Sequence, residues 1–196
     1  MTDGIQILEK PEWVTWDEIH EVLIHSHSEN RSKGIIMRKP SLPGDEIRRE
    51  IGEDGIMLVA FYDNKLVGTA GLLKKECKSW FHKGYYGYCC FDAVLPEYNG
   101  KGIYRELCEI RTQIAQKKGL EALYVDTHHE NKHAIDVNLR NGFRRVGVRN
   151  LSDHWNVVLF KWLDGCPYSD MKCNYEFLRR KYVLLLRRFL RTLIKK

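Results

Sequence analysis

The stretch AVLPEYNGKGIY, residues 93–104, carries the strongest signal about the fold of this 196-residue chain. It joins residues 85–94, an apolar run typical of a β-strand, to residues 103–117, where apolar side chains recur every three or four positions as in an amphipathic helix. Gly100 and Gly102 let backbone amides gather in the turn, and the helix start adds unpaired N–H groups and positive dipole. The turn is therefore suited to bind a pyrophosphate, although an ordinary glycine-rich turn would contain the same residues.

The spacing of the two glycines matches neither GxGxxG nor GxxxxGK[ST], which argues against dinucleotide and Walker-type nucleotide binding. Further along the chain, Asn131 and Ala134 form an N-x-x-A segment, and Gly142 and Phe143 follow the helix expected there. In order and spacing these residues resemble the GCN5-related N-acetyltransferase (GNAT) superfamily. Its pattern is V-x-P-x-x-R/Q-G-x-G-x-G/A, then N-x-x-A and a closing G-F. The resemblance is strongest over residues 56–148.

The flanking segments predict a mixed α/β chain. Thr15 and Glu18 form a capping box that begins a first helix. The other expected elements are a loop over 31–42, a helix over 45–53, a hairpin of strands 56–62 and 66–73, strands 85–94 and 122–127, a helix over 132–141, and a terminal antiparallel pair, 143–148 and 155–162.

The resemblance implies one α/β (α+β) GNAT-like domain over residues 1–165. Its sheet would be mostly antiparallel, with a central splayed parallel pair, 88–94 and 122–127, and helices on both faces.

The resemblance further implies acetyl-CoA as acyl donor. The backbone at Val94 would contact the acetyl and pantetheine portion. Asn131 would contact the pantetheine arm or order the turn beside it, and Asn99 stands where the family has Arg or Gln. The amides expected to hold the pyrophosphate are those of Gly100, Lys101, Gly102, Ile103 and Tyr104.

Acyl transfer to an amine needs a base for the amine and a proton donor or stabiliser for the leaving thiolate. Asp92 is the candidate base, because it precedes Val94 by two residues on the expected strand; the alternative is a carboxylate paired with an arginine. His128 is a candidate proton relay, the alternative being a solvent-exposed histidine pair. Many relatives have a tyrosine where this chain has Asn138, so Tyr104 or water is left as the acid.

Six cysteines include no CxxC pair, so the sequence gives little support for a zinc site and predicts no metal. Cys90 shares the strand parity of Asp92, which raises a covalent acyl-cysteine as an alternative to simple packing. Reduced thiols, the absence of a secretory signal pattern and the lack of a long apolar run favour a cytoplasmic protein.

The basic charge is concentrated at one end of the chain. Residues 174–196 contain eight Lys and Arg residues against Glu176, so they carry +7 while the formal net charge is +6. Leucines and aromatic residues recur among these cations, so we expect a basic amphipathic helical extension over 166–196. It could pack on the domain, form a homodimer contact, or lie on an anionic membrane. Nucleic acid is disfavoured, because a broad apolar face does not serve phosphate binding.

These observations predict an acetyl-CoA-dependent N-acetyltransferase that moves an acetyl group to a primary amine by direct attack. The acceptor, a small molecule or a peptide, stays open among an amino sugar, a small metabolite, a peptide N-terminus and a lysine. Two alternatives remain: a non-catalytic acyl-CoA-binding module, and an acyltransferase with another acyl donor or an alcohol acceptor.

Overall fold

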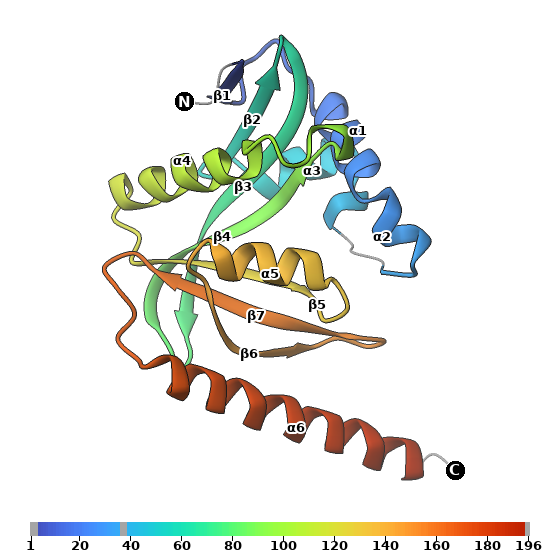
Figure 1. The fold of residues 1–196 in the computed structure, drawn as a ribbon, viewed down its shortest axis with the longest axis vertical. Helices are drawn as coiled ribbons and strands as arrows, with labels where there is room; N and C mark the ends of the chain where they lie inside the picture. The colour runs from blue at the N-terminus through green and yellow to red at the C-terminus, as the bar shows by residue number, and fades with distance from the viewer. Residues whose placement is uncertain (1–3, 36–38, 195–196) are drawn as a thin grey trace. The chain divides into compact units, whose positions relative to one another are not determined.

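The structure is a computed structural model that describes residues 4–35 and 39–194 (Figure 1). The chain forms two compact units, residues 1–123 and 124–196. The expected boundary near residue 165 stays a prediction. The loop expected over 31–42 includes residues 36–38, which lie outside the described residues.

The sheet of the first unit has the strand order β1-β2-β3-β4, with every neighbouring pair antiparallel. A tight two-residue turn joins β2 to β3: Asp63 and Asn64 both have positive φ, 49° and 63°, as the hairpin turns that match strand twist require. The strands are β1 (Ile5–Glu9), β2 (Ile56–Tyr62), β3 (Lys65–Lys78) and β4 (Lys83–Val94).

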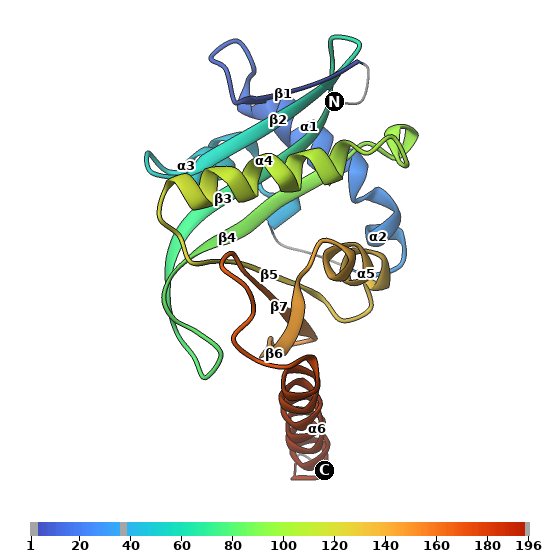
Figure 2. The ribbon, with the colours of Figure 1, turned by 60° about the vertical axis from the view of Figure 1, so that its left-hand side comes forward.

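Helices cover both faces of this sheet. The capping box at Thr15 is confirmed, with its hydroxyl accepting from the Glu18 amide and the Glu18 carboxylate accepting from the Thr15 amide. Figure 2 shows α4 on one face of β2 and β3, and α1 with α3 on the other. The elements are α1 (Trp16–Ser26), α2 (Ser28–Ser32), the short 3-10 turns η1 (Lys39–Ser41) and η2 (Pro96–Tyr98), α3 (Gly44–Ile51) and α4 (Ile103–Lys117).

The core of the first unit lies between the sheet and these helices. β2 is buried from Ile56 to Phe61 because side chains on both of its faces are covered. Ile19, Ile47 and Leu107, one from each of α1, α3 and α4, are completely inaccessible to solvent. β4, which carries the candidate site, pairs with β3 of this packed sheet.

The second unit has its strands in the order β5-β7-β6, with β6 and β7 antiparallel as expected. The helix α6 packs against β6, and Phe143, Leu159 and Phe160 are buried in the core of the unit. Its elements are β5 (Ala122–His128), whose first two residues belong to the first unit, α5 (Lys132–Arg140), β6 (Arg144–Asn150), β7 (Trp155–Trp162) and α6 (Asp170–Ile194).

The mixed α/β class with a mostly antiparallel sheet is confirmed. The structure adds β1 and α2, which the sequence analysis did not predict, and it begins α6 at Asp170. Among residues 4–35 and 39–194, no helix combines the length and the apolar character that crossing a membrane requires.

Candidate functional site

The turn between β4 and α4 has the backbone geometry of an anion cradle. Gly100 and Gly102 have φ of 80° and 82°, a left-handed conformation that favours glycine. Gly102 is the N-cap of α4, so the amides just after it have no acceptor within the helix. A Cβ atom placed on Gly100 would meet nothing within 4 Å, so the outer side of the turn is open. The turn therefore fits a phosphate group.

Two residues of this turn are partly engaged elsewhere. The Asn99 amide donates to the Pro96 carbonyl at 3.1 Å. The Lys101 amide lies 3.4 Å from the Tyr98 carbonyl, and the Lys101 ammonium stands 4.6 Å from the centre of the Tyr62 ring. Of the amides expected to hold the pyrophosphate, that of Lys101 is thus the least free. Its cation is nevertheless held beside the turn.

A β-bulge in β4 sets the direction of the Asp92 side chain. Thr69 pairs with Ala93 and Gly71 with Cys90, so two residues of β4, Phe91 and Asp92, oppose a single residue of β3. Phe91 has φ of 55°, and its carbonyl accepts a 2.7 Å hydrogen bond from the buried Thr69 hydroxyl. The bulge therefore has its own support in the neighbouring strand.

The bulge overturns the expected shared parity of Cys90 and Asp92. A Cβ atom on Gly71 would lie 3.0 Å from the Cys90 sulfur and 3.2 Å from Ile51 of α3. Asp92 instead reaches Arg111 of α4, on the other face of the sheet. Burial raises the pKa of Cys90 to about 12, so the thiolate that an acyl-cysteine would need is scarce at neutral pH.

Asp92 lies at the centre of a buried polar network. Its Oδ1 accepts from Arg111 Nη1 at 2.5 Å, and its Oδ2 accepts from the Tyr104 hydroxyl at 3.1 Å. Burial works to lower the pKa of Arg111, but the charge of Asp92 outweighs it and holds that pKa well above its usual value. Burial, together with Asp92, raises the pKa of Tyr104. Two predicted catalytic residues, Asp92 and Tyr104, are thus hydrogen-bonded to each other. Asp92 is also paired with an arginine, Arg111, as the alternative interpretation of the sequence expected.

His27 is a neighbour of this network that the sequence analysis missed. It follows α1, and its Nε2 lies 3.2 Å from the Asp92 carbonyl. Its Nδ1 is buried and has no hydrogen-bond partner in the part of the chain that the structure describes. Burial lowers the pKa of His27, so the ring is neutral at neutral pH. Because His27 and Asp92 are 65 positions apart in the sequence, only the fold could reveal this contact.

The second unit contains His128, Asn131 and Asn138. His128 is 5% exposed and stacks on the His129 ring, so the alternative of a solvent-exposed pair is wrong for His128. Its Nδ1 accepts from the Glu130 amide at 3.2 Å, and burial lowers its pKa. It is therefore a neutral ring with a fixed orientation.

The two asparagines support α5. The Asn131 side-chain oxygen accepts from the Ala134 amide at 3.2 Å and caps the helix, so Asn131 orders the turn at its start. Asn138 is 4% exposed, and its Nδ2 donates to the Ala134 carbonyl at 2.8 Å. No carboxamide can protonate a thiolate, and this one is held within its own helix.

Among the described residues, no group of three or more His, Cys, Asp or Glu side chains is placed to hold a metal ion. The turn, Val94, Asp92 and Tyr104 belong to the first unit, and His128 and Asn131 belong to the second.

Comparisons with known proteins agree with this architecture. A family model described as "Acetyltransferase (GNAT) family" matches residues 16–143. No curated protein sequence matches the chain. Many solved structures share the fold at low sequence identity.

Three of these solved structures illustrate the likeness. An acetyltransferase of the GNAT family from Staphylococcus aureus has 18% identity and a TM-score of 0.63, covering 81% of this chain and 99% of its own. The PaiA N-acetyltransferase from Thermoplasma acidophilum, in complex with coenzyme A, has 21% identity and a TM-score of 0.58, covering 81% and 98%. A GNAT family acetyltransferase from Elizabethkingia anophelis with acetyl-CoA bound has 16% identity and a TM-score of 0.58, covering 82% and 99%.

Proposed function

Because the chain belongs to the GNAT acetyltransferase family, we propose that it transfers an acetyl group from acetyl-CoA to a primary amine by direct attack. The observation that carries this proposal is the pair of left-handed glycines, Gly100 and Gly102, at the start of α4. Acetyl-CoA, when bound, supplies a thioester carbonyl for the amine to attack. Two structural neighbours that contain coenzyme A or acetyl-CoA support this choice of donor.

We propose that the turn, the end of β4 and the start of α5 hold the donor. The amides of Gly100, Gly102, Ile103 and Tyr104 would bind the pyrophosphate, with Lys101 and Asn99 beside them. Val94, at the end of β4, would contact the acetyl and pantetheine portion through its backbone. Asn131 would order the turn before α5. Helix N-termini bind such anions because their amides and their dipole act together.

Asp92 is the proposed acceptor of the amine proton. The Asp92 side chain is 18% exposed, so an incoming amine can approach its carboxylate. Arg111 and Tyr104 fix the position of that carboxylate. His128 is a proposed relay in the second unit, where burial keeps it neutral. The chain thus offers a carboxylate of fixed orientation and neutral imidazoles, the group types that general base catalysis uses.

Calorimetry with acetyl-CoA, followed by release of free thiol over a panel of amines, tests the proposal. Gly100→Ala is expected to weaken donor binding at least tenfold, because the new side chain strains the turn. Gly119→Ala is the matched control: it also replaces a left-handed glycine with open space around it, but at the other end of α4. Equal effects of the two changes, or no binding of acetyl-CoA by the native chain, would contradict the proposal that this turn binds the pyrophosphate.

Asn138 favours one alternative, a non-catalytic acyl-CoA-binding module, because it stands where many relatives have a tyrosine and is tied to its own helix. Donor binding without thiol release from any amine or alcohol would support that module. Release with alcohols alone, or with another acyl-CoA alone, would support an acyltransferase of different specificity. Asp92→Asn is expected to slow turnover while donor binding persists.

We also propose a cytoplasmic protein, a choice supported by six cysteines that are all free. The basic helix α6 offers a surface that either a membrane or a second copy of the chain could cover. The acceptor amine would then be met in the cytoplasm or at a membrane surface.

A further inference from the structure

The helix α6 is attached to the second unit along one narrow face. Cys173, Phe177 and Leu184 are its buried side chains, with exposures of 1%, 8% and 9%. Arg188, on the same face, donates to the Asn150 side chain at 2.7 Å and to the Leu151 carbonyl at 2.7 Å. Hydrogen bonds to the β6–β7 connection therefore fix the rotation of the helix about its own axis.

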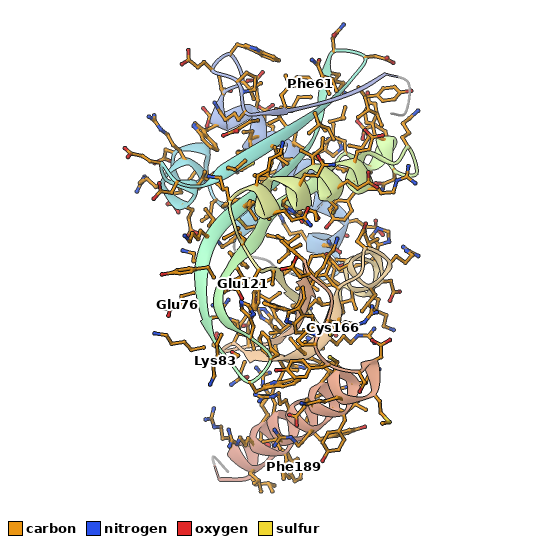
Figure 3. All side chains as sticks on the ribbon, turned by 90° about the vertical axis from the view of Figure 1, so that its left-hand side faces the viewer. Phe61, Glu76, Lys83, Glu121, Cys166 and Phe189 are labelled. Carbon is orange, nitrogen blue, oxygen red and sulfur yellow. The ribbon has the colours of Figure 1, made fainter. Side chains whose placement is uncertain are left out.

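With this rotation, α6 presents a second apolar face to solvent. The side chains on it are spaced three or four residues apart, and each is at least 44% exposed. Figure 3 places Phe189 on the side of α6 that points away from β6. We call this face the outer stripe: it consists of Tyr175, Leu178, Tyr182, Leu186, Phe189 and Leu193. A contiguous exposed apolar face of this kind marks an interaction surface.

The charge around the outer stripe is strongly positive. Residues 170–193 contain seven Lys and Arg residues, of which Arg188 is held at the β6–β7 connection, and two acidic residues. Both acidic side chains are already paired, Glu176 with Arg179 at 2.7 Å and Asp170 with Arg144 at 2.6 Å. Two copies joined through this stripe would bring like charges together, whereas an anionic phospholipid surface attracts them.

We propose that the outer stripe lies in the surface of an anionic phospholipid bilayer, with α6 parallel to the membrane plane. Apolar side chains enter the boundary between headgroups and acyl chains, and the flanking cations bind the headgroups. The tyrosines of the stripe suit this boundary, because their rings are apolar and their hydroxyls polar. The inference does not depend on the acetyl transfer proposed above.

Co-sedimentation of the full chain with vesicles tests the proposal. The chain is expected to bind vesicles that contain about 30% phosphatidylserine at least tenfold more tightly than pure phosphatidylcholine. Binding should weaken at least tenfold between about 0.05 and 0.3 M salt, since screening reduces the attraction of surface cations. Equal binding to both vesicle types, or no binding to either, would overturn the proposal.

Two double variants with no change of charge locate the contact. Leu186→Gln with Phe189→Gln is expected to weaken binding at least tenfold, because two side chains of the stripe lose their apolar burial. Val183→Gln with Leu185→Gln is the control: both are exposed apolar residues of α6 outside the stripe, 42% and 38% exposed, and a change of no more than about threefold is expected. Equal effects of the two pairs would contradict the assignment of the stripe.

The oligomeric state separates a membrane from a second copy as the occupant. In analytical ultracentrifugation, the native chain is expected to form no dimer through the outer stripe. Leu186→Gln with Phe189→Gln should therefore leave the sedimentation unchanged. Such a dimer, without binding to vesicles, would replace the lipid surface by a second copy. Circular dichroism and binding of acetyl-CoA should be the same for all variants, which distinguishes loss of the surface from loss of the fold.

Discussion

The buried ion pair between Asp92 and Arg111 supports a quantitative prediction about stability. Asp92→Asn keeps the shape of the side chain but removes its charge, so the Arg111 guanidinium, 1% exposed, would stay in the interior without a counter-charge. Its other acceptors are distant: the Gly71 carbonyl at 3.4 Å and the Cys108 sulfur at 3.7 Å. Breaking a buried pair in this way costs about 3–5 kcal/mol. We expect about 3 kcal/mol, because water partly reaches Asp92.

The opposite change is expected to cost less. Arg111→Met removes the buried charge, and the Asp92 carboxylate that remains still accepts from Tyr104 and is 18% exposed. The expected loss is about 1–2 kcal/mol. Both changes together leave no unpaired charge, so the double variant should lose about 2 kcal/mol less than the sum of the single changes.

Urea unfolding at neutral pH, followed by tryptophan fluorescence, measures these free energies. A matched control on the same helix is Arg105→Met and Glu109→Gln, which break an exposed pair at 3.8 Å with side chains 67% and 62% exposed. That control is expected to cost less than about 0.5 kcal/mol. If Asp92→Asn costs no more than the control, or if the double variant equals the sum, the buried pair is not a coupled unit.

Three further changes test the turn, the bulge and the buried histidine. Gly102→Ala, at φ 82°, is expected to destabilise the chain by about 1–2 kcal/mol in urea unfolding, and an unchanged free energy would show that the turn relaxes. Thr69→Val removes the hydroxyl that donates to the Phe91 carbonyl, at an expected cost of about 1–3 kcal/mol, while Thr192→Val on the surface should cost far less. Burial lowers the pKa of His27 below its ordinary 6.5, so the unfolded chain binds more protons than the folded chain. Stability should therefore fall as pH drops through about 6.5, and His27→Gln should flatten this slope between about pH 7.5 and 5.5, an outcome that urea titrations at several pH values would confirm or refute.

Short-range signals predicted much of the fold. The capping box at Thr15, the turn between the expected strands 56–62 and 66–73, and the apolar spacing of residues 103–117 each depend on atoms within a few positions of one another. The structure places a helix, a hairpin and a helix there. Such signals are visible in one sequence because the chain itself supplies both partners of each interaction.

Long-range features were not predictable in the same way. β1 is a five-residue edge strand whose pairing with β2 joins residues 49 to 57 positions apart. The bulge at Phe91 carries no glycine, so nothing in the sequence marked the change of parity between Cys90 and Asp92. Arg111 lies on a helix that looked amphipathic, and only the packed structure shows that its guanidinium points inward to a carboxylate.

Tyr104 contributes two groups to the site, and one substitution separates them. Its backbone amide lies in the first turn of α4, where it would bind the pyrophosphate, whereas its phenol donates to Asp92 at 3.1 Å. Burial and the charge of Asp92 raise the pKa of Tyr104, so the phenol keeps its proton at neutral pH and orients the carboxylate. Tyr104→Phe keeps the amide and the ring, so binding of acetyl-CoA measured by calorimetry should not change.

The rate of thiol release then distinguishes orientation from proton donation. If the phenol only orients Asp92, Tyr104→Phe should slow turnover by about tenfold, and Asp92→Asn should slow it further. A general acid contributes about a hundredfold or more. A loss of that size in Tyr104→Phe, with donor binding intact, would make the phenol the proton donor to the leaving thiolate. It would also mean that its bond to Asp92 is given up during turnover, because one hydroxyl proton cannot serve both oxygen and sulfur.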